Sequence, residues 1–276
     1  MLSLEMLVQE IDSVPPLPTT VTRALQVIED RESSAKELAK VLAEDQSITA
    51  TLLKYANSAY YGVSRTVSTV SEATVILGFT TIRSMLLTAS VHKLVNREIS
   101  GYALAQGELW KHSIQCAMVA KNLAKKCKFP QVEQAFVAGL IHDIGKVVLN
   151  NYVGAQYREI ISTVEQEHIP FMEAEKQILG FNHAEVGARL ALKWNLPEDL
   201  VDAIAHHHSP RGSERNSKLT ALVHVADAIC LMLGFGLGSD GLLYPLDEAV
   251  LDMVGLTVEL IEEAMVEVQE LPEFDI

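Results

Sequence analysis

The chain has 276 residues, of which 49% are hydrophobic and 21% are charged, a composition typical of a globular protein rather than a disordered one. Its 22 basic and 36 acidic residues give a formal net charge of −14. Nucleic acids and anionic membrane surfaces attract clustered Lys and Arg, so this charge argues against both as partners. A small phosphate-bearing ligand stays compatible, because a bound metal ion reverses the local field.

The three cysteines, Cys116, Cys127 and Cys230, form no Cys-x-x-Cys pair, which is typical of free, buried thiols in a reducing cytosol. The N-terminus lacks a basic region followed by an apolar one. The longest uncharged stretch, 228–239, is shorter than the roughly 20 apolar residues of a spanning helix. We therefore expect a cytoplasmic protein without a membrane partner.

The first half of the chain can hold several uninterrupted helices, because no proline occurs between Pro18 and Pro130. The capping box Ser34-Ala-Lys-Glu37 precedes apolar residues at helical spacing, and the same spacing recurs over 48–56 and 73–86. Near the end, apolar residues over 260–268 predict an amphipathic helix. Two-residue alternation is scarce, so the sequence predicts an all-α fold.

The clearest chemical signal is the pair His142-Asp143, which follows an apolar run and precedes Gly145-Lys146. Imidazole and carboxylate are ligands for divalent transition metals. Adjacent side chains on a helix point about 100° apart, so both can reach one ion, or Asp143 can bridge two. Lys146 can hold a phosphate oxygen as a point charge. The alternatives are a polar helix end for the pair and an exposed lysine for Lys146.

Most other histidines, and two further acids, lie at the edges of apolar helical segments or within them. They are Glu108, His112, His183, His206, His207, His208, His224 and Asp227. Glu108 and His112 lie four residues apart and share a helix face. Asp227 is costly to bury in its apolar helix unless it is paired or coordinates a metal. Each residue alone has a structural alternative, such as a hydrogen-bonded core histidine, but the set favours a metal site.

The order of His112, His142-Asp143 and Asp227 resembles the HD superfamily of metal-dependent phosphohydrolases. Further motifs are similar to its HDOD branch. They are Gly180-Phe-Asn-His183-Ala-Glu-Val-Gly187, Trp194-Asn-Leu-Pro197, Ala203-Ile-Ala-His-His-His208-Ser-Pro210, Pro15-Pro-Leu-Pro18, Leu53-Lys-Tyr-Ala-Asn57-Ser-Ala-Tyr60 and Ala73-Thr-Val-Ile-Leu-Gly78. The resemblance covers about residues 12–235 and rests on several motifs in the right order.

This resemblance implies an N-terminal HDOD helical bundle over 1–100 and an HD-like metal-binding helical core over 101–235. A C-terminal loop and helix over 236–276 would pack on the core. The polar segment 95–107 is the softest candidate boundary in the sequence, and further loops are expected at 209–218 and 234–245.

HDOD proteins are usually bacterial signalling modules, and many have lost the metal ligands, whereas this chain keeps them. Matched motif by motif to the related HD-GYP phosphodiesterases, the chain has the ligand types for two or more ions. In the run His206-His207-His208 the match assigns the paired ligands to His207 and His208, which leaves His206 as the odd member of the histidine triple. The implied ligands are Glu108, His112, His142, Asp143, His183, His207, His208 and Asp227. Mixed histidine and carboxylate ligands without cysteine suit iron, manganese, nickel or zinc.

The resemblance and the residues leave two functions to weigh. The first is metal-dependent hydrolysis of a nucleotide or phosphodiester, with Asp143 and Lys146 as catalytic residues. The second is a non-catalytic signalling module, in which the metal site is structural or senses a ligand and a kinase or response regulator is the partner. A helical interaction protein without metal is a third reading. The Gly-Tyr-Pro loop of HD-GYP enzymes is replaced by Ser209-Pro-Arg-Gly-Ser-Glu-Arg215, which argues against cyclic di-GMP as the substrate.

Overall fold

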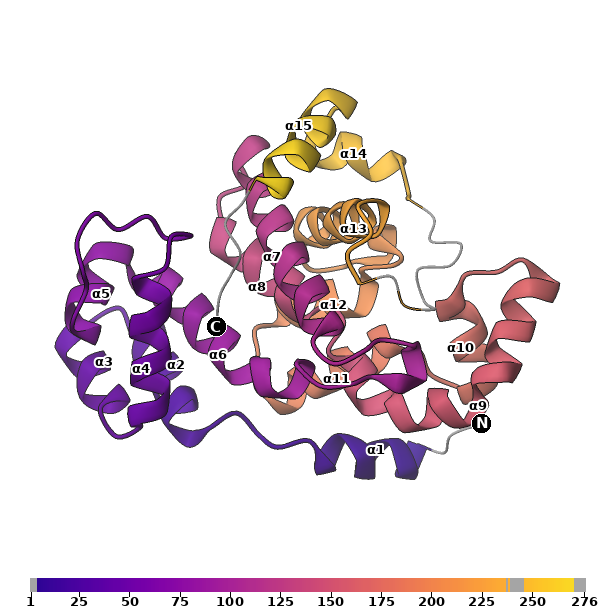
Figure 1. The fold of residues 1–276 in the computed structure, drawn as a ribbon, viewed down its shortest axis with the longest axis horizontal. Helices are drawn as coiled ribbons and strands as arrows, with labels where there is room; N and C mark the ends of the chain where they lie inside the picture. The colour runs from indigo at the N-terminus through magenta and orange to yellow at the C-terminus, as the bar shows by residue number, and fades with distance from the viewer. Residues whose placement is uncertain (1–3, 237, 239–245, 271–276) are drawn as a thin grey trace. The chain divides into compact units, whose positions relative to one another are not determined.

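The computed structural model describes residues 4–236, 238 and 246–270 of the chain. These residues form helices joined by loops, and the described part contains no β-strand beyond an isolated bridge between Ile99 and Leu104. The predicted all-α fold is therefore confirmed (Figure 1). Among the described residues, no helix is both long enough and apolar enough to cross a membrane.

The helices group into two units. The smaller unit comprises Leu17–Lys93 with residues 269 and 270, and the larger comprises residues 4–16 with Leu94–Val268. The three-part division at residues 100 and 235 stays a prediction. Helix α1 (Leu4–Ser13), which that division assigns to the N-terminal bundle, groups with the larger unit.

In the smaller unit, side-chain caps fix where the helices start. The Ser34 hydroxyl accepts the Glu37 backbone N–H while the Glu37 carboxylate accepts the Ser34 N–H, so the predicted capping box is confirmed. Asp45 and Thr69 cap the next two helices. The helices of this unit are α2 (Thr19–Glu29), α3 (Ala35–Leu42), α4 (Gln46–Ala56), α5 (Val70–Leu77) and most of α6 (Phe79–Val95). Their apolar faces pack around a core that includes the fully buried Leu52.

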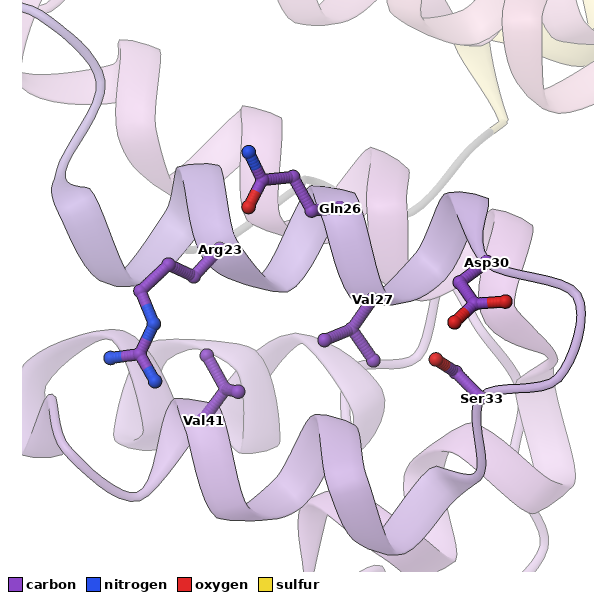
Figure 2. Close-up of a pocket in the computed structure, with 6 residues that line it drawn as sticks. All are labelled: Arg23, Gln26, Val27, Asp30, Ser33 and Val41. Atoms are coloured by element: carbon purple, nitrogen blue, oxygen red, sulfur yellow. The ribbon is translucent and has the colours of Figure 1, made fainter.

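A shallow pocket of about 320 Å³ lies on this unit, lined by residues of α2, of α3 and of the turn between them. Figure 2 shows Arg23 towards one end of the pocket and Asp30 towards the other. The Arg23 guanidinium is bound to the Glu44 carboxylate, and Asp30 accepts the backbone N–H of Glu32. These charged groups therefore already have partners within the unit.

The larger unit holds the predicted metal ligands. Its further elements are η1 (Ser100–Tyr102), α7 (Glu108–Lys126), α8 (Val132–Ile141), α9 (Gly145–Glu167), α10 (Phe171–Leu179), α11 (His183–Lys193), α12 (Glu198–His206), η2 (Pro210–Gly212), α13 (Ser217–Met232), α14 (Ala249–Val254) and α15 (Val258–Gln269). Helix α7 packs against α8 and α13, and α9 packs against α10 and α11 (Figure 1). The predicted C-terminal helix is confirmed as α15, which buries Ile261, Ala264 and Val268.

The two ends of this unit are tied down by long-range contacts. The Lys193 ammonium on α11 donates to the Ile11 and Val14 carbonyls, 2.8 and 3.2 Å away, which hold the end of α1. At the other end, the Lys126 ammonium on α7 binds Glu263 and Glu267 of α15. The helices that carry the predicted ligands are thus held between these two terminal helices.

Candidate metal centre

Several helix ends converge on a buried cluster of histidines and aspartates. His112 lies on α7, His142 directly follows α8, His183 begins α11 and Asp227 lies on α13. Asp143 lies in the tight turn between α8 and α9, and His207 and His208 directly follow α12. All except His208 expose at most 3% of their surface, and His208 is partly buried. Seven of the eight predicted ligands are brought together in this way.

Asp143 lies between two sets of imidazoles. Its Oδ2 is 3.4 Å from His112 Nε2 and 3.3 Å from His142 Nε2. Its Oδ1 faces the other way, 3.5 Å from His183 Nε2 and 3.8 Å from His207 Nε2. One carboxylate therefore presents one oxygen to each set, as a ligand that bridges two ions would.

The cluster accordingly has two halves. The Asp227 half consists of His112, His142, Asp227 and Oδ2 of Asp143, with Asp227 Oδ1 3.1 Å from His112 Nε2 and 3.7 Å from His142 Nε2. The His208 half consists of His183, His207, His208 and Oδ1 of Asp143, and the Nε2 atoms of His183 and His208 are 2.8 Å apart.

A close approach of two helices positions the bridging aspartate. A Cβ atom on Gly145 would lie 1.9 Å from the His183 carbonyl oxygen and 2.7 Å from the Gly187 nitrogen, so only glycine fits at the start of α9. Gly187 of α11 in turn lies against the Gly145 nitrogen. This contact brings the α8–α9 turn, with Asp143, against the start of α11, with His183.

The histidine rings are oriented by their Nδ1 atoms. His142 Nδ1 is 2.8 Å from the Gly139 carbonyl, His207 Nδ1 is 2.7 Å from that of Ile204, and His112 Nδ1 is 3.0 Å from that of Phe235. A carbonyl can only accept, so each Nδ1 carries a proton and each Nε2 is directed towards the cluster.

The Nε2 atoms of His142 and His207 are buried and make no hydrogen bond. Buried polar atoms without a partner are rare, and here they point into a cluster of imidazoles and carboxylates. Imidazole nitrogens in this position, beside carboxylate oxygens, are the donors that a divalent transition metal takes. The residues present therefore fit such an ion.

The charges of the cluster follow from its neighbours. Burial alone would raise the pKa of Asp143 and Asp227, but histidines, and Lys146 at Asp143, hold both pKa values well below the ordinary range. Burial opposes protonation of His142, yet the two carboxylates raise its pKa well above normal. Burial and the neighbouring His142 lower the pKa of His207 to about 3. The carboxylates are thus ionised and His207 is neutral at neutral pH.

Lys146 lies beside the bridging aspartate. Its ammonium is 2.5 Å from Asp143 Oδ2 and 5.8 Å from the centre of the Tyr102 ring, and the side chain is buried. The sequence alternative of an exposed lysine is wrong. The buried cation is placed where it can meet an anion that reaches the cluster.

Glu175, on α10, is a partner of the cluster that the sequence reading missed. Its Oε2 is 2.8 Å from both His183 Nδ1 and the His183 backbone nitrogen, and the Tyr102 hydroxyl donates to its Oε1. Glu175 is fully buried. A carboxylate on the outer nitrogen of a ligating histidine fixes the ring and raises its basicity. The available signal was an acid on the apolar face of α10, beside Phe171 and Leu179.

Two other named residues lie outside the cluster. The Glu108 carboxylate, in the first turn of α7, accepts the Ala105 backbone N–H at 2.5 Å, and its role as a ligand stays a prediction. His224 turns away: its Nδ1 is 2.7 Å from the His207 carbonyl, and its Nε2 accepts the Asp247 N–H at 3.0 Å. His224 thus supports the backbone of a ligand instead of joining the ligands.

The segment that replaces the Gly-Tyr-Pro loop folds onto Asp202. This buried carboxylate accepts from the Ser213 hydroxyl and from the backbone N–H groups of Arg215 and Asn216. His206 also turns towards Asp202, with its Nδ1 3.0 Å from Asp202 Oδ1, and so away from the metal ligands. The odd member of the histidine triple therefore contacts the carboxylate that holds this loop.

Comparison with known proteins agrees with this architecture. The HDOD domain model matches residues 14–210. An HDOD domain protein of unknown function from Geobacter sulfurreducens has a solved structure with a TM-score of 0.70 and 27% identity, covering 99% of this chain and 100% of that one. A candidate phosphohydrolase from Shewanella amazonensis gives a TM-score of 0.72 and 27% identity, with 96% and 93% covered.

The curated relatives are longer than this chain. An uncharacterised protein of Treponema pallidum is 25% identical over 219 residues, which are 79% of this chain and 42% of that protein. Ribonuclease Y of Thermus thermophilus is 34% identical over 119 residues, which are 43% of this chain and 16% of the ribonuclease. The chain thus covers less than half of the length of either relative.

Proposed function

The chain belongs to the HDOD domain family, and on that basis we propose that it is a metal-dependent phosphohydrolase that cleaves a small phosphodiester or nucleotide. The observation that carries the proposal is the position of Asp143, whose two oxygens face two different pairs of imidazole Nε2 atoms. A purely structural polar cluster has no need of a carboxylate divided between two sets of donors.

The protein's own residues would perform most of the positioning. Divalent ions held by the two halves would supply a Lewis acid and lower the pKa of water. The imidazoles of His142 and His207, fixed through Nδ1, keep their Nε2 atoms aimed inward. Lys146 would hold a phosphoryl oxygen and stabilise the charge that develops on it. Burial strengthens each of these interactions because it removes competing water.

The choice of substrate combines two observations. Relatives named ribonuclease Y support a phosphodiester, the bond that a ribonuclease cleaves. The net charge of −14 disfavours a long polyanion, so a small phosphodiester or nucleotide fits better than RNA. The altered loop on Asp202 also supports a substrate other than cyclic di-GMP.

Elemental analysis by mass spectrometry, followed by hydrolysis of bis(4-nitrophenyl) phosphate, tests the proposal. We expect two ions per chain and metal-dependent turnover in the wild type, both lost in Asp143→Asn. Asp252→Asn removes an exposed carboxylate from the same unit and serves as the control. A protein that takes up no ion after reloading with zinc, manganese, iron or nickel would overturn the proposal.

A signalling module is the second candidate function, and one observation favours it. The cluster is so deeply buried that only His208 among its ligands is partly exposed, which suits an ion that stabilises the fold. In that case the ions bind and raise the melting temperature, but no phosphoester is cleaved. A kinase or response regulator would then be the partner to seek.

A further inference from the structure

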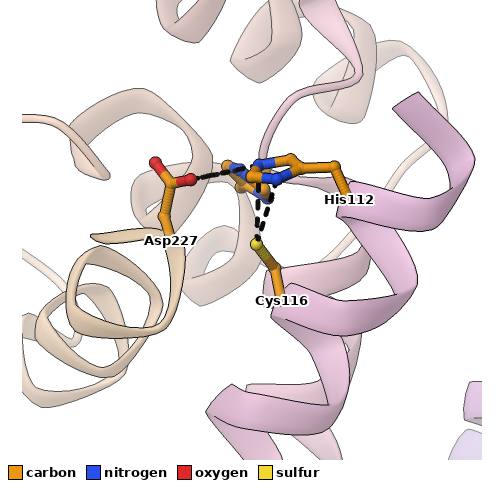
Figure 3. A group of neighbouring side chains, drawn as sticks. His112, Cys116 and Asp227 are labelled. Carbon is orange, nitrogen blue, oxygen red and sulfur yellow. Dashed lines mark hydrogen bonds and ion pairs between the residues drawn. The ribbon is translucent and has the colours of Figure 1, made fainter. Parts of the chain in front are cut away.

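Cys116 lies at the Asp227 half of the cluster, one helical turn after His112 on α7. Its Sγ atom is 3.5 Å from His112 Nε2. Ligand atoms of Cys116, His112, His142 and Asp227 all lie within 4.8 Å of one another, and all four residues are buried. Figure 3 shows the thiol and the Asp227 carboxylate both directed towards the His112 ring.

Two of the separations among these atoms are close to those between ligands of one zinc ion. With zinc bonds of about 2.3 Å to sulfur and 2.0–2.1 Å to nitrogen, a tetrahedral angle sets the sulfur–nitrogen separation at about 3.6 Å. The separation in the structure is 3.5 Å. The same geometry sets a nitrogen–oxygen separation of about 3.3 Å, and His112 Nε2 and Asp227 Oδ1 are 3.1 Å apart.

The packing of two helices places the thiol beside the cluster. A Cβ atom on Gly139 of α8 would lie 2.7 Å from the Cys116 carbonyl oxygen, so glycine allows α7 and α8 to approach closely at this turn. His142 follows three residues later, and its Nε2 is one of the buried atoms without a hydrogen bond. An unpartnered nitrogen and a thiol therefore point into the same small space.

We propose that Cys116 is a thiolate ligand of the ion in the Asp227 half, and that this half therefore takes zinc in preference to manganese. Sulfur ligands favour zinc and other thiophilic metals, whereas manganese prefers oxygen. Coordination breaks the Sγ–H bond: sulfur keeps the electron pair for the metal, and the proton passes to solvent. The inference rests on the proposed metal cluster and adds to it a ligand and a metal class.

Cobalt substitution tests the inference, because a cobalt–thiolate bond produces an intense near-ultraviolet absorption band that nitrogen and oxygen ligands do not. We expect this band in the wild type and saturation at one equivalent of Co²⁺. In Cys116→Ser and Cys116→Ala the band should disappear. Zinc affinity should also fall at least about tenfold, because losing a residue that only hydrogen-bonds to a metal ligand already costs about that much. Cys230→Ser is the matched control, since Cys230 is also buried and lies against Cys116.

The outcomes separate this inference from the proposed function. If Co²⁺ binds with visible d–d absorption but without the near-ultraviolet band, Cys116 is not a ligand and the metal cluster stands. A band that survives in Cys116→Ser, or that disappears in Cys230→Ser instead, also overturns the inference. If Co²⁺ does not bind at all, the proposed function fails first.

A measurement on the wild type covers the case in which the Cys116 variants do not fold. X-ray absorption of the zinc protein loaded with one equivalent should contain a sulfur scatterer at about 2.3 Å. A shell of nitrogen and oxygen alone would exclude the thiolate. Circular dichroism of each variant decides which of the two measurements is used.

Discussion

The two halves of the metal cluster share Asp143 but offer different donors. The Asp227 half adds a second carboxylate and a thiol, and the members of its candidate ligand group are all buried. The His208 half adds only imidazoles, and His208 is partly exposed. The partners of the Nδ1 atoms differ as well. Nδ1 of His112 and of His142 each contacts a backbone carbonyl, whereas Nδ1 of His183 contacts the buried carboxylate of Glu175.

This difference suggests a division of labour within one cluster. Anionic ligands in a buried site should hold their ion tightly and release it slowly, because each adds charge attraction where little water screens it. Neutral imidazoles at the partly exposed edge should bind more weakly and leave room for an exchangeable ligand. We therefore expect the Asp227 half to retain its ion and the His208 half to meet the substrate.

Replacing the shared ligand should have the largest effect. Asp143→Asn keeps the shape but removes the charge from both halves, so we expect both ions and all turnover to be lost. The contribution of metal binding to the free energy of unfolding should vanish too. In the wild type one ion contributes about 4 kcal/mol when the free ion is at a thousand times its Kd. Calorimetry with and without a chelator measures it. If the variant keeps one tightly bound ion, the bridging role of Asp143 is wrong.

Removing the buried cation should come next. Lys146→Met keeps the length and apolar stem of the side chain but loses the ammonium beside Asp143. We expect turnover to fall by roughly 10²–10³, the cost typical of losing one group that stabilises the developing charge. Both ions should remain, since Lys146 is not a metal ligand. Lys121→Met is a suitable control, because Lys121 is largely buried on α7 and pairs with Glu133. An unchanged kcat would remove Lys146 from the mechanism.

The sequence could predict the ligands that lie in short motifs. His142-Asp143 follows an apolar helix and the His-His pair ends another, so local pattern alone places them at helix ends. The structure brings these residues together, as the resemblance implies. Glu108 differs: the four-residue spacing puts it on the face of His112, but its carboxylate lies in the first turn and binds the Ala105 backbone.

Other parts of the site depend on contacts between distant segments, which one sequence cannot reveal. Tyr102 and Glu175 are separated by 73 positions and meet only after α10 packs on α9. Cys116 looked like an ordinary core hydrophobe until the fold placed its sulfur beside His112. The grouping of α1 with the larger unit likewise depends on a distant contact, the hydrogen bonds from the Lys193 side chain to the end of α1.

Disturbing one half alone sharpens the comparison. Glu175→Gln replaces the carboxylate that orients His183, so binding of the weaker ion should fall about 10- to 100-fold. Binding of the tighter ion should not change, because Glu175 contacts no residue of the Asp227 half among the described interactions. Competitive titration with a chromophoric chelator resolves the two affinities. Tyr102→Phe, which removes only the outermost hydrogen bond, should have a smaller effect in the same direction.

The smallest effect should come from the loop that follows the histidine triple. Burial alone would raise the pKa of Asp202, but hydrogen bonds from Ser213 and from the Arg215 and Glu214 backbone lower it. A carboxylate whose pKa is lower in the folded state than in the unfolded state stabilises the fold at pH values above its unfolded pKa of about 3.9. This stabilisation is lost as the pH falls through the pKa of the folded state.

Asp202→Asn should therefore cost about 1–3 kcal/mol between pH 5 and 8, the cost of leaving buried donors unsatisfied. The gap between wild type and variant should begin to shrink below about pH 4 and should close as the pH falls through the lowered folded pKa of Asp202. Urea unfolding across this pH range measures it. Because the loop directly follows His207 and His208, the tighter ion should bind normally in the variant. A variant that loses that ion would mean that the two halves are coupled through the fold and do not act separately.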